Sequence, residues 1–430
     1  MGVASRLRSA RLRLRLRCRR DNHFLEKVKL MKTQDYIQLE DQYGAHNYHP
    51  LDVVIDKAEG VWVYDVNGRK YLDCLSAYSS VNQGHVHPKI LEALVEQSKK
   101  VTITSRAFRN DQLPLLYKEL SEMTGYEMSL PMNSGAEAVE TAIKLARKWA
   151  YQVKGVPRYQ AEIIVCEGNF HGRTTTAISI STEPLYRDDF GPFMPGFVIV
   201  PYRDSAAIES AITPNTAAVM LEPIQGEGGV IVPPEGYLKQ VAGICKKNNV
   251  LFVADEIQTG LGRTGKLFAC DYEGVRPDIM IIGKALSGGF YPVSAALADK
   301  PIMDLFAPGE HGSTFGGNPL GAAVARASLR VIREESLADR ADVLGTYFIE
   351  QLAEIPSPHV KEVRGKGLLI GVELKREAQG ARRFCEALKK RGILAKETHE
   401  HVIRFAPPLV IDKETIDWVL PHIRDVLNMA

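Results

Sequence analysis

The chain has 430 residues, of which 45% are hydrophobic and 25% are charged, the balance of a globular protein with room for about two to three domains. No stretch approaches the ~18 uninterrupted apolar residues of a membrane span, and the six cysteines stand singly, which argues against a disulfide scaffold or a thiolate zinc site. The formal net charge of +2 comes from the N-terminal end, so it gives no reason to expect nucleic-acid binding by the rest of the chain.

Residues 1–30 hold the basic excess. They contain eight arginines and two lysines against two acids, which leaves residues 31–430 with 44 basic and 50 acidic side chains. An Arg-rich leader is typical of mitochondrial targeting segments, but the Leu/Arg alternation here has a period of two and does not make an amphipathic helix. We interpret residues 1–30 as a disordered extension or a misassigned start, because Met31 opens an acceptable start. We therefore expect a cytoplasmic protein, with the mitochondrial matrix as the alternative.

Residues 31–80 are expected to form an N-terminal segment that packs with the C-terminal domain. Within this segment, residues 44–75 alternate apolar and polar side chains around the pair Asn67-Gly68. That pattern predicts a β-meander with a tight turn.

Residues 81–335 are expected to form the larger domain. Near-continuous apolar runs predict strands buried on both faces, as in a parallel sheet covered by helices. These runs lie within residues 161–169, 196–204, 217–225, 250–258 and 278–286. Apolar residues three and four apart predict helices within residues 89–100, 137–152 and 237–249. The fold class is therefore α/β with a mostly parallel sheet, followed at residues 336–430 by a smaller α+β domain.

Polar side chains follow several of the predicted strands. Ligands of open α/β sheets bind beyond the carboxyl ends of the strands. Lys284 leaves an apolar strand into a glycine-rich turn, where desolvation would lower its pKa, as a Schiff-base nucleophile requires. Asp255 closes another strand and could keep a pyridine nitrogen protonated. Taken alone, such an Asp is more often a turn cap and such a Lys is usually solvated.

Two further stretches resemble phosphate contacts. Ser134 and Glu137 have the spacing of a capping box, and the small residues Gly135 and Ala136 leave backbone N–H groups open at the positive end of the following helix. By itself this pattern is more often an ordinary well-capped helix. A hydroxyl pair, Ser313-Thr314, lies in a second glycine-rich loop. Together with Lys284 and Asp255, these groups predict a pyridoxal phosphate site.

At this point the chain resembles the class III, fold type I aminotransferases, and among them the members that act on ornithine. The resemblance covers residues 36–428, and the Asp-Glu-x-Gln-x-Gly-x-Gly-Arg-Thr-Gly stretch followed 29 residues after Asp255 by Lys284 is highly specific for the class. The stretches that carry the resemblance are YGAHNYHPL, SAYSSVNQGHVHP, PMNSGAEAVETAIKLARKW, GNFHGRT, GPFMPGF, EPIQGEGGV, ADEIQTGLGRTG, GKALSGGFYPVSA, HGSTFGGNPLG, VRGKGLL and IRFAPPLVI.

The resemblance implies a role for each cofactor residue. Lys284 would form a Schiff base with the cofactor and move the proton, and Asp255 would pair with the pyridine nitrogen. Gln258 would lie near the 3′ oxygen of the ring, and Phe170 would stack on the ring. The phosphate would be held by Ser134, Gly135 and Ala136, joined by Ser313 and Thr314 from the neighbouring subunit. We therefore expect a homodimer whose active site is shared across the interface.

The resemblance also implies how the substrates bind. Tyr48, Tyr78 and Arg173 match positions that hold the distal α-amino-carboxylate end of ornithine. Arg404 matches the arginine that binds the α-carboxylate of 2-oxoglutarate or glutamate, and Glu227 matches the acid that pairs with it when ornithine is bound. Such a pair would act as a switch between the two half-reactions, whereas the simpler interpretation is a surface salt bridge.

The implied reaction is ping-pong transfer of the δ-amino group of L-ornithine to 2-oxoglutarate or another 2-oxo acid. It gives L-glutamate 5-semialdehyde, which cyclises to pyrroline-5-carboxylate, and L-glutamate. The alternatives are an acetylornithine or 4-aminobutyrate aminotransferase, a same-fold aminomutase or decarboxylase, and a silent dimeric binding module. We expect no metal site, because no His pair has a completing ligand, and no dinucleotide site, because no GxGxxG joins a strand to a helix. The sequence leaves open whether the flux serves ornithine catabolism or proline supply.

Overall fold

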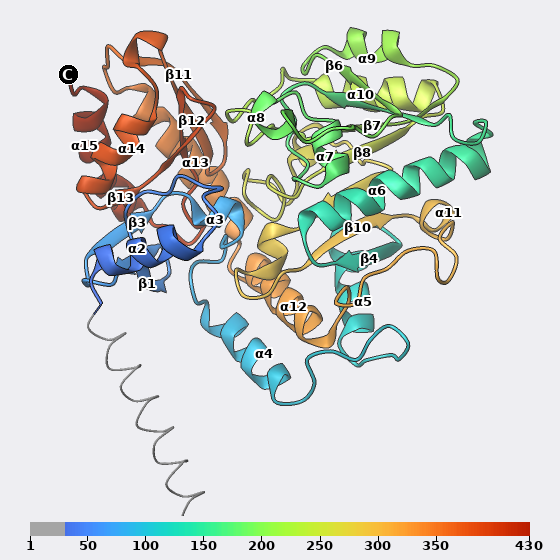
Figure 1. The fold of residues 1–430 in the computed structure, drawn as a ribbon, viewed down its shortest axis with the longest axis horizontal. Coiled ribbons are helices and arrows are strands. Elements are labelled where there is room, and N and C mark those ends of the chain that lie inside the picture. Colours follow the sequence, from blue (N-terminus) through green and yellow to red (C-terminus); the bar gives the residue numbers. More distant parts are fainter. Residues whose placement is uncertain (1–30) are drawn as a thin grey trace, which may run out of the picture. The chain divides into compact units, whose positions relative to one another are not determined.

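The computed structural model describes residues 31–430, so the predicted extension 1–30 lies outside the described residues. Figure 1 labels the helices and strands of the described chain. The described chain divides into two compact units, one made of residues 31–58 and 63–70 and the other of residues 59–62 and 71–430. This division differs from the boundaries expected near residues 80 and 336, and the division into domains at those two points stays a prediction.

The first unit holds the helix α2 (Thr33–Tyr43) and most of the strands β1 (Ile55–Glu59) and β2 (Trp62–Asp65). The tight turn predicted at Asn67-Gly68 is confirmed. Asp65 Oδ1 accepts hydrogen bonds from the backbone N–H groups of Asn67 and Arg69, each at 2.9 Å. Gly68 has a φ of +81°, which a residue with a side chain rarely adopts. The turn is also joined to α2, since Asn67 Nδ2 donates to Thr33 Oγ1 at 2.7 Å.

Seven strands form the central sheet of the second unit, in the order β4-β10-β9-β8-β7-β5-β6. Their bounds are β4 (Met128–Met132), β5 (Glu162–Cys166), β6 (Phe197–Val200), β7 (Thr216–Leu221), β8 (Leu251–Asp255), β9 (Ile279–Ile282) and β10 (Ser294–Ala298). The five strands predicted from apolar runs are confirmed as β5 to β9, and they pair in parallel. Every residue of β7, β8 and β9 is buried, as continuous apolar runs predict.

The strands β4 and β10 were not anticipated, and β10 pairs antiparallel with both β4 and β9. The connection between β9 and β10 explains the direction. A parallel return needs a crossover of a dozen or more residues, usually a helix, whereas residues 283–293 hold only the short 3-10 helix Lys284–Ser287 and a glycine turn. Gly289 in this turn has a φ of +79°, and a Cβ there would come within 2.3 Å of Val81 Cγ1.

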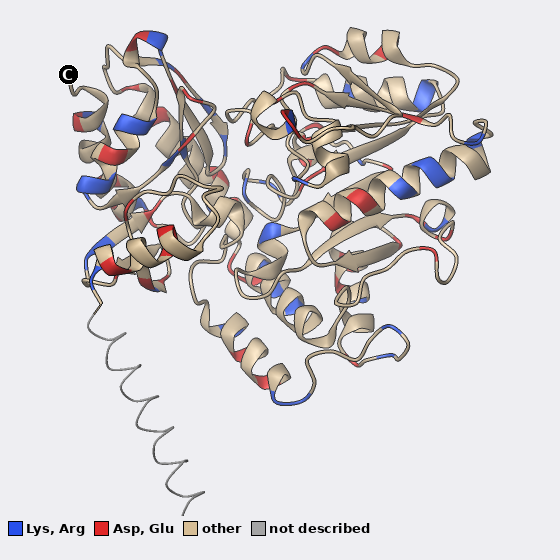
Figure 2. Cartoon of the chain, in the orientation of Figure 1, with Lys and Arg blue, Asp and Glu red and all other residues tan. Residues whose placement is uncertain are grey.

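Helices pack against the strands of this unit, and the three predicted helices are confirmed as α4, α6 and α10. The helix bounds before residue 335 are α3 (Ser76–Ser79), α4 (Pro88–Ser98), α5 (Leu113–Thr124), α6 (Gly135–Trp149), α7 (Thr175–Ser179), α8 (Pro184–Arg187), α9 (Ser205–Ala211), α10 (Tyr237–Lys247), α11 (Lys300–Met303) and α12 (Pro319–Glu334). Acids lie early in α6 and basic residues in its last turn (Figure 2), which suits the helix dipole.

After residue 335 the second unit continues with a four-stranded antiparallel sheet in the order β11-β12-β15-β14. The elements are α13 (Leu337–Ala353), β11 (Val360–Lys366), β12 (Leu369–Leu374), α14 (Arg382–Lys390), β13 (Ile393–Leu394), β14 (Lys396–Thr398), β15 (Val402–Phe405) and α15 (Lys413–Leu427). β13 pairs in parallel with β3 (Lys70–Asp73) through Leu72 and Asp73. The predicted mixture of helices and strands in residues 336–430 is confirmed. No helix within residues 31–430 is long and apolar enough to cross a bilayer.

Candidate functional site

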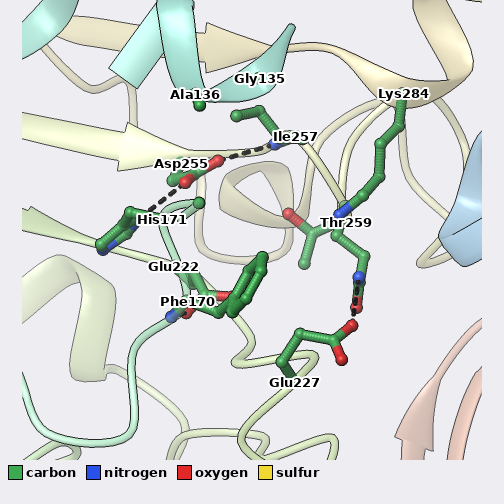
Figure 3. A pocket seen from close by; sticks show the side chains of 12 residues that line it. Gly135, Ala136, Phe170, His171, Glu222, Glu227, Asp255, Ile257, Thr259 and Lys284 are labelled. Atoms are coloured by element: carbon green, nitrogen blue, oxygen red, sulfur yellow. Dashed lines mark hydrogen bonds and ion pairs between the residues drawn. The ribbon is translucent and has the colours of Figure 1, made fainter. Parts of the chain in front are cut away.

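A cavity of about 190 Å³ lies at the carboxyl ends of the parallel strands of the second unit (Figure 3). The register of the sheet brings its side chains together. Leu221 lies opposite Ala254, so the next residues, Glu222 and Asp255, are level at the same edge. Asp255 in turn lies opposite Ile281, so Lys284 follows just beyond it. The lining residues are Gly135, Ala136, Phe170, His171, Gly172, Glu222, Glu227, Asp255, Ile257, Gln258, Thr259 and Lys284.

Asp255 is held on both carboxylate oxygens. Its Oδ2 lies 2.7 Å from His171 Nδ1, and its Oδ1 accepts the backbone N–H of Ile257 at 3.0 Å, as Figure 3 shows. Burial lowers the pKa of His171, but the hydrogen bond and charge of Asp255 outweigh it and raise that pKa above its usual value. The two contacts therefore hold the Asp255 side chain in a fixed orientation.

Lys284 reaches into the cavity from the turn that follows β9. Its φ of +41° is unusual for a residue with a side chain. Burial lowers the pKa of Lys284, and the carboxylates of Glu227 and Asp255 oppose the shift without cancelling it. A lysine with a lowered pKa has more of its neutral amine form at neutral pH, and the neutral form is the nucleophile and the base.

Glu227, which is partly buried, forms an ion pair with the buried Arg404. Arg404 Nη1 donates to Glu227 Oε1 at 2.6 Å, and Gln258 Nε2 donates to the same oxygen at 3.1 Å. Arg404 is only 1% exposed, yet its Nε and Nη2 have no partner among the described residues. Burial raises the pKa of Glu227, but the charges of Arg404 and Lys284 lower it below its usual value. The salt bridge is thus not a surface one, and part of its arginine stays available.

Tyr78 lies beside this pair, with its ring centroid 5.1 Å from Arg404 Cζ. The ring is carried by the short helix α3, in which Ser76, Ala77, Tyr78 and Ser79 all have a positive φ between 45° and 72°. Four successive left-handed residues without glycine are costly. The turn is held from outside, since Ser76 Oγ donates to the Ala406 carbonyl at 2.7 Å and accepts from Arg263 Nη2 at 2.9 Å.

The N-terminus of α6 closes another side of the cavity, and the predicted capping box is confirmed. Ser134 Oγ accepts the backbone N–H of Glu137 at 3.2 Å, and Glu137 Oε2 accepts that of Ser134 at 2.7 Å. The first N–H groups of a helix have no intrahelical acceptor, so those of Gly135 and Ala136 are open to an anion. A Cβ at Gly135 would come within 3.0 Å of Ile257 Cδ1, so a larger residue there would have to displace the Ile257 side chain.

Of the predicted site residues, seven line the cavity directly. They are Gly135, Ala136, Phe170, Glu227, Asp255, Gln258 and Lys284. Ser134, Tyr78 and Arg404 adjoin it through the contacts above. The fourth adjoining residue is Arg173, whose Cζ lies 5.8 Å from the centroid of the Phe170 ring.

Three predicted residues neither line nor adjoin this cavity. Tyr48 belongs to the first unit and is 67% exposed. Ser313 Oγ accepts a hydrogen bond from Asn133 Nδ2 at 2.8 Å, and Thr314 is exposed. The contribution of Ser313 and Thr314 to the cavity of a neighbouring subunit stays a prediction.

Two titratable residues of the cavity lining, Glu222 and His171, were given no role by the sequence. Glu222 Oε2 accepts the backbone N–H of Phe170 at 2.9 Å, and burial raises the pKa of Glu222 to about 7. Its position directly after β7 matches that of Asp255 at the end of β8, so the search for polar residues at strand ends could have found it. His171 follows the predicted ring-stacking Phe170, and no sequence signal marks it as the partner of Asp255. Within residues 31–430, no three His, Cys, Asp or Glu side chains are grouped to hold a metal ion.

The chain matches a protein family described as aminotransferase class-III over residues 43–427. It is 61% identical to an ornithine aminotransferase of Brevibacillus brevis over 93% of this chain and 100% of that protein. It is 59% identical to an ornithine aminotransferase of Bacillus subtilis over 93% of this chain and 99% of that protein.

The chain is also similar to solved structures of aminotransferases. The ornithine aminotransferase of Toxoplasma gondii matches with a TM-score of 0.92 and 46% identity, over 94% of this chain and 97% of that one. A second structure of that parasite enzyme is described with pyridoxal phosphate at partial occupancy in its active site. An acetylornithine aminotransferase of Elizabethkingia anophelis matches with a TM-score of 0.84 and 51% identity, over 92% of this chain and 99% of that one.

Proposed function

The chain belongs to the class-III aminotransferase family, and from that membership we propose that it transfers the δ-amino group of L-ornithine to 2-oxoglutarate or another 2-oxo acid. Pyridoxal phosphate is the cofactor. The products are L-glutamate 5-semialdehyde, which cyclises to pyrroline-5-carboxylate, and L-glutamate. The observation that carries the proposal is the ion pair between the buried Arg404 and Glu227, which lines the same cavity as Lys284. A two-substrate reaction needs an arginine whose charge can be neutralised for one substrate and made available to the other.

The residues of the cavity fit pyridoxal phosphate. Asp255, fixed by His171, would hold the protonated ring nitrogen, and the open N–H groups at the start of α6 would hold the phosphate. The buried Gln258 Oε1 has no partner among the described residues, which suits a place beside the polar edge of the ring. When bound, the cofactor supplies a conjugated ring that accepts the electrons released when a proton leaves the substrate carbon.

Lys284 would attach the cofactor and then move the proton. Because its pKa is lowered by burial, its Nζ could take the proton from Cδ of ornithine as a neutral amine and would then deliver that proton to C4′ of the cofactor. The carboxylates of Glu227 and Asp255 stabilise the ammonium form that exists between the two events. Phe170 would cover one face of the ring and exclude water from it.

Glu227 and Arg404 would select the substrate for each half-reaction. Ornithine presents to the reacting site a chain end that carries the δ-amine and no carboxylate. The salt bridge can therefore stay closed and cancel the charge of Arg404. 2-Oxoglutarate brings a carboxylate to the same place. Arg404 Nε and Nη2, which have no partner among the described residues, can donate two parallel hydrogen bonds to that carboxylate. Tyr48, Tyr78 and Arg173 would hold the distal α-amino-carboxylate end of ornithine.

We also propose that the enzyme is a homodimer with its active site shared across the interface. Residues 91–115 of the second unit expose six large apolar side chains, more than an isolated chain is expected to leave in water over so short a segment. They are Leu91, Val95, Val101, Ile103, Phe108 and Leu115. A second copy of this chain is the partner that the proposed shared site requires, through Ser313 and Thr314.

The cytoplasm is the compartment that we propose. Five cysteines lie in the described residues, and all five are buried thiols, which fits a reducing compartment.

A comparison of amino donors tests the proposed function. The purified holoenzyme should show a kcat/KM with L-ornithine, in the presence of 2-oxoglutarate, at least about a hundredfold above the values for N-acetylornithine and 4-aminobutyrate. A preference for either of the latter two would keep the family and the cofactor and assign the chain to one of the sister activities.

A further inference from the structure

Tyr186 lies on α8 (Pro184–Arg187), a short helix that none of the predicted site residues occupies. Its ring is half-buried and meets the edge of the Phe170 ring at a centroid distance of 5.9 Å and an interplanar angle of 77°. Such an edge-to-face contact is a favourable arrangement of two aromatic rings. Because Phe170 lines the cavity, Tyr186 contacts a residue of the cavity wall.

Arg173 lies against the same two rings. Its Cζ is 4.1 Å from the centroid of Tyr186 and 5.8 Å from that of Phe170, both within the range of a cation–π contact. No carboxylate within residues 31–430 pairs with Arg173. An aromatic face attracts a guanidinium without using its N–H donors, so the fork of donors stays free for a carboxylate from outside. An acid in the place of Tyr186 would occupy that fork.

The backbone around α8 holds Tyr186 in this position. Arg187 Nη1 donates to the carbonyl oxygens of Ile178, Ser179 and Ser181 at 2.9 to 3.0 Å, which fixes the end of α8 to the C-terminal end of α7 and the residues just after it. The neighbouring Leu185 is 79% exposed, so α8 presents one side chain to solvent and the next one to Arg173. Partial burial raises the pKa of Tyr186, with Arg173 opposing the shift, so the phenol is neutral at neutral pH.

We propose that Tyr186 is a positioning residue that holds the Arg173 guanidinium ready for the distal carboxylate of the amino donor, and that it thereby sets the preference for donors that carry a carboxylate at that end. The inference rests on the proposed function, because it takes the donor to be ornithine. It adds to that function a residue whose aromatic ring contacts the carboxylate-binding arginine.

The test compares the variants Tyr186→Leu and Tyr186→Phe with wild type in the first half-reaction of the holoenzyme. The matched control is Leu185→Ala, which removes the exposed neighbour on the same helix. Three ligands separate the contributions: L-ornithine, 5-aminopentanoate, which keeps the carboxylate without the α-amine, and 1,4-diaminobutane, which lacks the carboxylate and is followed as a competitor of ornithine.

Tyr186→Leu should raise the half-saturating concentration of ornithine and of 5-aminopentanoate by about tenfold, the scale of one cation–π contact. The limiting rate should change by no more than about twofold, because no reacting atom is touched. The inhibition constant of 1,4-diaminobutane should stay at the wild-type value. Tyr186→Phe keeps the ring face and should restore most of the affinity lost in Tyr186→Leu.

Two results would overturn the inference while leaving the proposed function intact: unchanged saturation by ornithine in Tyr186→Leu, or an equal loss for 1,4-diaminobutane, which would indicate a general structural effect. A wild-type enzyme that does not react with ornithine would instead overturn the proposed function, and the inference with it.

Discussion

Lys284 and Asp255 meet at one edge of the central sheet because β8 and β9 are neighbours in parallel register. The ammonium of Lys284 is desolvated there, and its lowered pKa suits both attachment of a carbonyl group and proton transfer. The rest of the proposed chemistry depends on this one amine.

Lys284→Ala should therefore lower kcat by at least about a thousandfold, because both the nucleophile and the base are lost. The variant should also lose bound pyridoxal phosphate on desalting, as the visible absorption of the protein would record. Lys300→Ala, at an exposed position, is the control and should keep both properties. Near-normal turnover in Lys284→Ala would contradict the role given to this residue.

A second prediction concerns the side chain of Glu227 and the choice of amino donor. Glu227→Ala leaves Arg404 without the carboxylate that accepts its Nη1 hydrogen bond. The freed arginine should bind the α-carboxylate of glutamate, so the ratio of half-reaction rates, glutamate over ornithine, should rise by about tenfold or more. Glu362→Ala removes an exposed acid that pairs with Arg364 and should leave the ratio unchanged. A constant ratio in Glu227→Ala would remove the switch from the account.

The sequence predicted these residues unequally well, for physical reasons. Asp255 and Lys284 were accessible because each ends a buried apolar run, and the geometry of a parallel sheet places such residues together. Glu222 follows the buried strand β7 directly and was overlooked. His171 could not be found, because its pairing with Asp255 depends on how the loop after β5 folds back over the sheet. The contact between His171 and Asp255 depends on the tertiary structure, so neither sequence segment predicts it by itself.

At the scale of elements, α6 combines two functions at its first turn. The capping box of Ser134 and Glu137 stabilises the helix, and the adjoining N–H groups of Gly135 and Ala136 face the cavity. A second helix, α15, begins with a side-chain cap of the same kind, in which Asp412 Oδ1 accepts the backbone N–H of Thr415 at 2.8 Å.

These two caps allow a matched comparison. Ser134→Ala and Asp412→Ala should each lower the free energy of unfolding by about 1 kcal/mol, the usual contribution of a helix cap. Only Ser134→Ala should also weaken the binding of pyridoxal phosphate, by about tenfold, because only α6 has its N-terminus at the proposed phosphate site. Equilibrium dialysis of the cofactor and chemical denaturation provide the two measurements. Equal cofactor affinities in the two variants would contradict a phosphate site at α6.

The sequence pattern predicted some strands of the central sheet and missed others. The five parallel strands were predicted because strands buried on both faces have continuous apolar runs. The antiparallel β4 and β10 were missed. β4 (MSLPM) contains a proline, which weakens a strand pattern, and β10 (SAALA) is made of small residues that resemble a helix in composition.

At the scale of the whole molecule, the proposed dimer depends on the apolar side chains that residues 91–115 expose. Phe108 is 71% exposed, so Phe108→Asp should leave the folded subunit intact while it places a charge in the proposed interface. Sedimentation velocity should show wild type at twice the mass of the chain and Phe108→Asp shifted towards the monomer.

The control for this prediction is Tyr159→Asp, at a side chain that is 92% exposed and lies outside residues 91–115; it should stay dimeric. A monomeric wild type with full activity would contradict the shared active site. The sequence could not supply this level of organisation by periodicity, because a side chain that is buried by a second copy has the same apolar character as one that is buried by its own fold.

The absorption of the cofactor tests directly whether the cavity removes the δ-amino group of ornithine. L-Ornithine is added to the purified holoenzyme without any 2-oxo acid, and the absorption of the cofactor is followed while the product is trapped. We expect the visible absorption band to disappear while a pyrroline is trapped, and to return when 2-oxoglutarate is added. No change with ornithine, but loss of the band with N-acetylornithine or 4-aminobutyrate, would contradict this expectation.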